Sequence, residues 1–157
     1  MSISKQTQLP LYSVLFEPAN YRVQSSAAKP SLVFLHGLLG STADWQPIIA
    51  DLSADYQCIC IDLPGHAGSQ AVTVNDFQHV QQLIITTLAQ YQLDNIILVG
   101  YSLGARIAMT IATEQASTWL YIIDGLLLES GPSGLNSIAE QIPAGIQDLG
   151  WVKAFRG

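Results

Sequence analysis

The pattern Gly-x-Ser-x-Gly at residues 100–104 constrains this chain more than any other feature. The mainly apolar residues 95–99 before it predict a buried strand, and residues 105–112 after it predict a helix. A sharp turn between a strand and a helix requires small neighbours, which Gly100 and Gly104 supply. Such a turn presents the Ser102 hydroxyl at a helix N-terminus, where backbone N–H groups favour developing negative charge. We therefore predict that Ser102 is a catalytic serine on a strand-to-helix turn, called the elbow below.

Further strands and helices alternate along the chain. Besides the segment before the elbow, strands are predicted at residues 11–17, 21–24, 31–35, 56–61 and 126–130. A helix is predicted at residues 44–53, capped by Ser41 or Thr42. A second, longer helix is predicted to be capped by Asn75 or Asp76 and to continue through Tyr91, because apolar residues from Phe77 to Tyr91 follow the helical period. This alternation predicts the α/β class, with a doubly wound and mostly parallel sheet. A chain of 157 residues has the size of a single domain, so we predict one domain over residues 1–157.

Chemically versatile side chains follow the predicted strands. His36, Asp62, Ser102 and Ser130 each lie at or just after a strand's carboxyl end. In open parallel sheets the ligand site lies beside those ends. The candidate site is therefore predicted at this edge of the sheet.

Composition excludes several classes of partner. Hydrophobic residues make up 49% of the chain and charged residues 11%, which indicates a globular protein. With a net charge of −6 and only six lysines and arginines, no basic patch is predicted for nucleic acid or anionic lipid. No apolar run reaches the roughly 18 residues of a membrane span and the N-terminus lacks a signal-peptide pattern, so a cytoplasmic protein is expected. Cys58 and Cys60 are expected to be buried free thiols, and we expect neither a metal nor a cofactor.

Three spaced motifs together resemble the α/β-hydrolase superfamily. They are His-Gly-Leu-Leu-Gly at residues 36–40, Asp-Leu-Pro-Gly-His at residues 62–66, and the elbow. Within that superfamily, residues 100–106, 129–135 and 151–155 are most similar to the SHCHC synthases of menaquinone biosynthesis. These lyases eliminate pyruvate from an enolpyruvyl cyclohexene carboxylate and yield 2-succinyl-6-hydroxy-2,4-cyclohexadiene-1-carboxylate. The resemblance implies a lyase with a small-molecule carboxylate substrate.

The resemblance also implies roles for individual residues. Ser102 would act as a base in proton abstraction, and the backbone N–H groups of Leu38 and Leu103 would form the oxyanion hole. Arg106 lies one helical turn after Ser102, on the same face of the helix. This helix is apolar nearly all round, so we expect it to pack in the centre of the domain, where a buried guanidinium needs an anionic partner. The residues leave open whether that partner is an internal carboxylate or a substrate carboxylate. The resemblance favours the substrate.

Tyr101 and His36 complete the substrate-binding candidates. Tyr101 is expected either to wall the site or to pack as an ordinary aromatic residue beside the elbow. Histidine in the loop after a strand more often braces backbone than contacts a substrate, so both roles stay open for His36. His66 is expected to be structural and His79 to be solvated on its helix.

The catalytic machinery of the superfamily is incomplete in this sequence. A serine base needs a histidine and an orienting carboxylate, which follow the serine in the chain order of the superfamily. Here all three histidines precede Ser102, and neither Asp124 nor Asp148 has the position of the acid. We expect that residues 131–157 form part of a lid, that the chain stops before the last two strands, and that it has negligible lyase activity alone.

Two other functions remain open at this point. The same serine could serve as the nucleophile of a carboxylic-ester hydrolase, or the chain could be a non-catalytic binding remnant. An exposed apolar edge of the sheet would make the monomer poorly soluble. The oligomeric state is left open.

Overall fold

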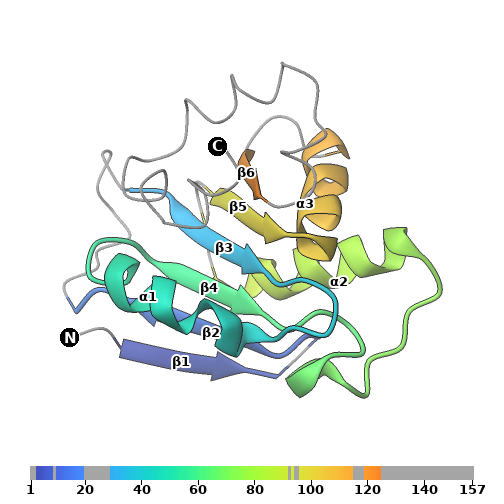
Figure 1. Ribbon diagram of the computed structural model, residues 1–157, viewed down its shortest axis with the longest axis horizontal. Coiled ribbons are helices and arrows are strands. Elements are labelled where there is room, and N and C mark those ends of the chain that lie inside the picture. Colours follow the sequence, from blue (N-terminus) through green and yellow to red (C-terminus); the bar gives the residue numbers. More distant parts are fainter. Residues whose placement is uncertain are drawn as a thin grey trace.

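The fold is seen in a computed structural model, shown in Figure 1, which describes residues 3–8, 10–19, 29–91, 93, 96–114 and 119–124. The strands are β1 (Ile3–Thr7), β2 (Ser13–Glu17), β3 (Ser31–Leu35), β4 (Cys58–Ile61), β5 (Ile96–Tyr101) and β6 (Trp119–Asp124). The α-helices are α1 (Gln46–Leu52), α2 (Phe77–Leu88) and α3 (Leu103–Glu114). Short 3-10 helices are η1 (Thr42–Trp45), η2 (Ala67–Ser69) and η3 (Ala89–Tyr91).

The described strands form one sheet in the order β1-β2-β4-β3-β5-β6. β1 and β2 run antiparallel to their neighbours, whereas β4, β3, β5 and β6 are parallel. Leu35 at the end of β3 is in register with Ile61 of β4 and Gly100 of β5. The carboxyl ends of these three strands therefore lie level, and the residues that follow them meet at one edge, as the sequence predicted.

Helices cover both faces of the sheet, which confirms the doubly wound prediction (Figure 1). Successive residues of a strand point to opposite faces, so the wholly buried β3 contributes to two cores. Val33 and Leu35 pack with residues of α2 and α3, whereas Leu32 and Phe34 pack with α1. Each fully buried side chain of this kind contributes about 1.5–3 kcal/mol to folding.

The two cysteines belong to the core on the α1 side. Cys58 and Cys60 are free thiols, as expected, and both are fully buried in β4. Burial raises the pKa of the Cys58 thiol to about 12 and that of Cys60 well above its ordinary value. Both therefore remain protonated and serve as small apolar residues.

Side-chain caps fix where two helical segments begin. Ser41 caps η1 in a reciprocal box with Asp44, and the chain then continues directly into α1. Asp76 caps α2 by accepting the backbone N–H of His79 at 2.8 Å. The helix predicted at residues 44–53 is therefore a 3-10 turn followed by an α-helix, and the one predicted to reach Tyr91 ends its α-helical part at Leu88.

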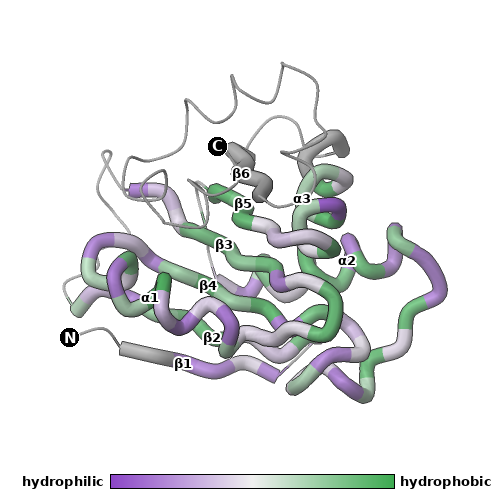
Figure 2. Tube along the Cα trace, viewed as in Figure 1, coloured by the Kyte–Doolittle hydropathy of each residue, from purple (hydrophilic) through white to green (hydrophobic). Residues whose placement is uncertain are grey.

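Each end of the described sheet has a strand that the sequence did not predict, β1 at one end and β6 at the other. β1 was not predicted, because this edge strand exposes Lys5 and Gln6 and lacks an apolar pattern, as Figure 2 also shows. The strand after α3 is β6, before the segment 126–130 in which the sequence analysis placed a strand. Residues 21–24, 126–130 and the expected lid at 131–157 lie outside the described residues.

Candidate active site

Ser102 occupies a strained position between β5 and α3. Its φ is +51°, a left-handed conformation that costs roughly 1–2 kcal/mol for a residue with a Cβ atom. A Cβ on Gly100 would lie 2.5 Å from the Cα of Ala105, and one on Gly104 would overlap the carbonyl of Leu35. These contacts confirm that the tight strand-to-helix approach requires glycine on both sides of the serine. Ser102 is half-buried, and its hydroxyl makes no hydrogen bond to any residue within the described ranges.

The turn after β3 runs beside this serine. The N–H of Gly40 donates to the carbonyl of Gly37 at 3.0 Å, and Leu39 has a φ of +62°. A Cβ on Gly37 would lie 3.5 Å from the Cβ of Ser102, so the backbone of the turn is next to the elbow. The structure therefore brings Gly37 and the elbow together, with Leu38 the next residue in the turn.

The two N–H groups predicted to form the oxyanion hole are unused within the described part of the chain. Leu38 donates no hydrogen bond to a described residue, and its side chain is 69% exposed. Leu103 is the first residue of α3, so its N–H has no acceptor within the helix. Both donors remain available to an oxygen atom.

His36 is buried where β3 ends, and both of its ring nitrogens are engaged. Nδ1 lies 2.7 Å from the carbonyl of Gly37, and Nε2 accepts the backbone N–H of Leu63 at 3.0 Å. Burial lowers the pKa of His36, which favours the neutral ring that can accept at Nε2. No ring nitrogen is left for a substrate, and this favours the bracing alternative over substrate binding.

Asp62 ties the loops after β3 and β4 together. Its side chain is 1% exposed, with Oδ1 accepting the N–H of Thr42 at 2.6 Å and Oδ2 accepting that of Gly68 at 2.9 Å. The sequence placed Asp62 at the site edge but predicted no role for it. The signal in the sequence is an acidic residue directly after a buried strand. Its role as an acceptor becomes visible only in the folded structure, where the N–H groups of Thr42 and Gly68 reach it.

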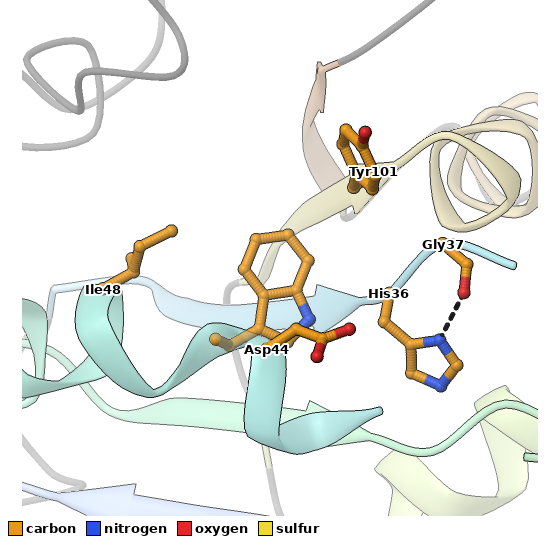
Figure 3. Close-up of a pocket in the computed structure, with 6 residues that line it drawn as sticks. His36, Gly37, Asp44, Ile48 and Tyr101 are labelled. Carbon is orange, nitrogen blue, oxygen red and sulfur yellow. Dashed lines mark hydrogen bonds between the residues drawn. The ribbon is translucent and has the colours of Figure 1, made fainter. Parts of the chain in front are cut away.

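Two hollows flank the elbow. The first, the Trp45 hollow, has a volume of about 310 Å³ and is lined by His36, Gly37, Asp44, Trp45, Ile48 and Tyr101. Figure 3 shows Ile48 and Tyr101 on opposite sides of it. Tyr101 is 45% exposed, so it forms a wall of the hollow and does not pack as a core aromatic.

The second, the Phe77 hollow, has a volume of about 280 Å³. It is lined by Leu63, Pro64, His66, Val74, Asn75, Asp76, Phe77, Val80, Leu103 and Ile107. Phe77 is 51% exposed, so the expected position of this residue on the buried helix face is wrong. Ser102 lies in the chain between Tyr101 of one hollow and Leu103 of the other.

Arg106 is exposed at the surface of α3. Its backbone N–H donates to the carbonyl of Ser102 at 3.2 Å, which fixes the two residues one helical turn apart. Among the described residues the one salt bridge joins Lys29 to Asp55 at 3.1 Å. The expectation that α3 buries this charge is therefore wrong, and the internal carboxylate alternative finds no partner in the described part of the chain.

Comparison with known proteins decides the family. Residues 30–118 match the family model described as the alpha/beta hydrolase fold. This chain belongs to the α/β-hydrolase family. The resemblance to this family was based on residues 36–40, residues 62–66 and the elbow.

Two curated relatives of this α/β-hydrolase carry the same enzyme name. A 2-succinyl-6-hydroxy-2,4-cyclohexadiene-1-carboxylate synthase of Escherichia fergusonii is 39% identical over 127 residues, which are 81% of this chain and 48% of the relative. The enzyme of the same name from Escherichia coli is 38% identical with the same coverage. The chain thus spans about half the length of the curated relatives it matches.

Solved structures share the fold. An alpha/beta hydrolase from Novosphingobium aromaticivorans superimposes with a TM-score of 0.65 at 19% identity, covering 88% of this chain and 49% of that one. E-2-(Acetamidomethylene)succinate hydrolase gives a TM-score of 0.60 at 24% identity, covering 76% and 42%. At these identities the likeness establishes the fold alone.

The described part of this α/β-hydrolase shows neither a metal centre nor a membrane span. Within it, no group of three or more histidine, cysteine, aspartate or glutamate residues is placed to hold a metal ion. None of its helices is long and apolar enough to cross a membrane. Asp124 ends β6, in backbone register with Tyr101 of β5, and Asp148 and Ser130 lie outside the described residues.

Proposed function

We propose that this chain carries the catalytic serine of an SHCHC synthase, a lyase that eliminates pyruvate from 2-succinyl-5-enolpyruvyl-6-hydroxy-3-cyclohexene-1-carboxylate. The relatives named as such synthases support the substrate class. The observation that carries the proposal is the left-handed φ of +51° at Ser102, with the turn of Gly37 packed beside it. In this proposal the enzyme works in the cytoplasm on a small-molecule carboxylate, without cofactor, nucleic acid or membrane.

Each candidate residue has one task in the proposed reaction. Ser102 takes the proton whose removal starts the elimination, and the N–H groups of Leu38 and Leu103 stabilise the oxygen on which negative charge develops. Loss of one such donor typically costs about 10²–10³ in rate. Arg106 is exposed and has no described carboxylate partner, so its planar guanidinium is free to bind a substrate carboxylate at two points. Tyr101 walls the ring of the substrate.

Within the described part of the chain, no residue forms a hydrogen bond to the Ser102 hydroxyl that could activate it. Every histidine in the sequence precedes the serine, and His36 uses both ring nitrogens on backbone groups. Removing a member of such a catalytic group typically lowers turnover on the order of 10⁶-fold. We therefore expect negligible pyruvate release from this polypeptide when it is assayed alone.

A chimaera tests the proposal where activity is measurable. The matched 127 residues would replace their counterpart in the Escherichia fergusonii synthase, whose remaining half is retained. We expect pyruvate release from the enolpyruvyl substrate, and its loss on Ser102→Ala. A folded chimaera that releases no pyruvate would contradict the proposal.

Ester hydrolysis is the outcome that the same chimaera can reveal. Enzymes that catalyse acyl transfer also use a serine nucleophile and an oxyanion hole. Hydrolysis of a simple aryl ester, dependent on Ser102 and without pyruvate release, would assign this chain to the carboxylic-ester hydrolases instead.

A further inference from the structure

Side chains of two residues join the loops after β3 and β4. His36 contacts the carbonyl of Gly37 and accepts from Leu63, and Asp62 accepts from Thr42 and Gly68. Each residue stands at the end of its strand, and each is 1% exposed. The turn at residues 37–40 is therefore connected to the loop after β4 through His36, which precedes the turn, and through Thr42, which follows it.

The partners of His36 fix its tautomer. A backbone N–H can only donate, so Nε2 must offer its lone pair to Leu63. A carbonyl can only accept, so Nδ1 must carry the proton that points to Gly37. Both requirements are met by one neutral form, protonated at Nδ1. In a ring protonated at both nitrogens, Nε2–H and the N–H of Leu63 would be two donors that point at each other, and the hydrogen bond would be lost.

We propose that His36 is a positioning residue, which holds the turn at residues 37–40 against the loop after β4 only while its ring is neutral and protonated at Nδ1. Protonation at Nε2 removes the acceptor of the Leu63 N–H and loosens the turn. Because that turn carries the N–H of Leu38, the consequence for catalysis rests on the proposed function. The hydrogen bond between His36 and Leu63, which joins the two loops, does not depend on the proposed function.

Three titratable groups act on His36. The ring of His66, on the loop after β4, lies 5.1 Å away between centroids, and its charge would oppose protonation of His36. Asp62 at the end of β4 and Asp44 in η1 favour protonation. Burial outweighs both carboxylates, so the pKa of His36 lies below its ordinary value. The neutral form therefore persists at neutral pH, and the contact is lost only in acid.

The first test reads the tautomer directly. With only three histidines, ¹⁵N-histidine labelling of the whole chain gives a simple NMR spectrum. At neutral pH we expect His36 to bear its proton on Nδ1, and we expect its pKa to lie below the ordinary histidine value of 6.5. Protonation of Nε2 at neutral pH, or the opposite tautomer, would overturn the proposal.

The second test measures hydrogen exchange of the Leu63 amide as a function of pH, corrected for the intrinsic exchange rate. We expect its protection to fall about tenfold or more as His36 becomes protonated, because a buried donor loses its acceptor. The amide of Leu98, in the central strand β5, is the reference for global unfolding. Constant protection of Leu63 through the protonation of His36 would overturn the proposal.

A matched pair of variants separates positioning from general stability. His36→Gln places a carbonyl oxygen that does not titrate near the position of Nε2, so Leu63 should stay protected at every pH at which the chain is folded. His79→Gln, on α2, changes a ring without a hydrogen bond to a described residue and should leave the pH dependence unchanged. The same pH dependence in His36→Gln as in the unmodified chain would contradict the assignment. None of these measurements needs turnover, so a failure of the proposed lyase activity would leave them decisive.

Discussion

The loops after β3 and β4, called the paired loops below, lie next to the elbow. The two regions are built in opposite ways. The elbow keeps a left-handed Ser102, and its hydroxyl has no hydrogen-bond partner in the described chain. The paired loops bury His36 and Asp62, and each of these side chains forms two hydrogen bonds to backbone. Strain and an unsatisfied hydroxyl are concentrated where a substrate would react, whereas satisfied polar groups hold the neighbouring turn still. The half-buried Ser102 is thus strained and without a described hydrogen-bond partner, next to loops whose buried polar groups are satisfied.

The largest effect on stability is expected when a side chain blocks the close packing at Gly104. In Gly104→Ala the new methyl group would overlap the Leu35 carbonyl, a backbone atom that cannot move aside. We expect the free energy of unfolding to fall by about 3 kcal/mol or more, measured by urea denaturation.

Gly65→Ala is the control for this substitution. Gly65 has a φ of +77° and open space where a Cβ would lie, so alanine adds backbone strain without a clash. We expect a loss of only about 1 kcal/mol. Equal effects of the two substitutions would show that the close approach at Gly104 does not limit folding.

The next effect concerns the buried carboxylate of the paired loops. Asp62→Ala leaves the N–H groups of Thr42 and Gly68 without their acceptor and should lower the free energy of unfolding by about 2 kcal/mol. Asp51→Ala removes an exposed carboxylate and should change stability by less than about 0.5 kcal/mol. If Asp62→Ala behaved like Asp51→Ala, the loops would not depend on this residue.

A smaller effect is expected from pH. Because burial depresses the pKa of His36, the unfolded chain binds a proton near the ordinary value of 6.5 before the folded chain does. The stability that this residue contributes is complete above pH 6.5 and decreases as pH falls from there toward the folded pKa. The difference in unfolding free energy between the unmodified chain and His36→Gln should therefore change in this window. A difference independent of pH would contradict the lowered pKa.

The smallest effect has the opposite sign. Ser102→Gly removes the strain of a left-handed φ, so the variant should be more stable by up to about 1 kcal/mol, after the entropic cost of glycine. Ser102→Ala keeps the Cβ atom and should gain nothing. If Ser102→Gly were no more stable than Ser102→Ala, the strain at Ser102 would be unimportant. Thermal denaturation of both variants decides between these outcomes.

The sequence predicted the elbow well because its requirements are local. Glycines on both sides of a serine, between an apolar strand and a helix, predict the tight turn from β5 into α3 from a few consecutive residues. The close contact of Gly104 with the Leu35 carbonyl of β3 depends on the fold and is seen only in the structure. β3 is likewise predicted from consecutive residues, because its apolar residues 32–35 reflect burial on both faces. Carboxyl ends that meet at one edge then follow from parallel pairing.

Features that depend on distant partners were not predictable in this way. The acceptor role of Asp62 depends on the N–H groups of Thr42 and Gly68, which only the folded loops bring to it. Arg106 was expected to be buried because its helix is apolar, but exposure depends on which face α3 turns to the sheet. β1 is an edge strand, and its polar residues give no periodic signal.

Binding of the product of the proposed reaction tests the central claim, that the edge around Ser102 is a carboxylate site, most directly. An NMR titration of the 157-residue chain with 2-succinyl-6-hydroxy-2,4-cyclohexadiene-1-carboxylate should show saturable shifts of the Leu38 and Leu103 amides. Arg106→Ala should weaken binding about tenfold or more, because a charged hydrogen-bond partner of the carboxylate is lost. Lys29→Ala, which removes a cation paired with Asp55, should leave the affinity unchanged. Absence of saturable binding, or equal affinity after Arg106→Ala, would contradict the account.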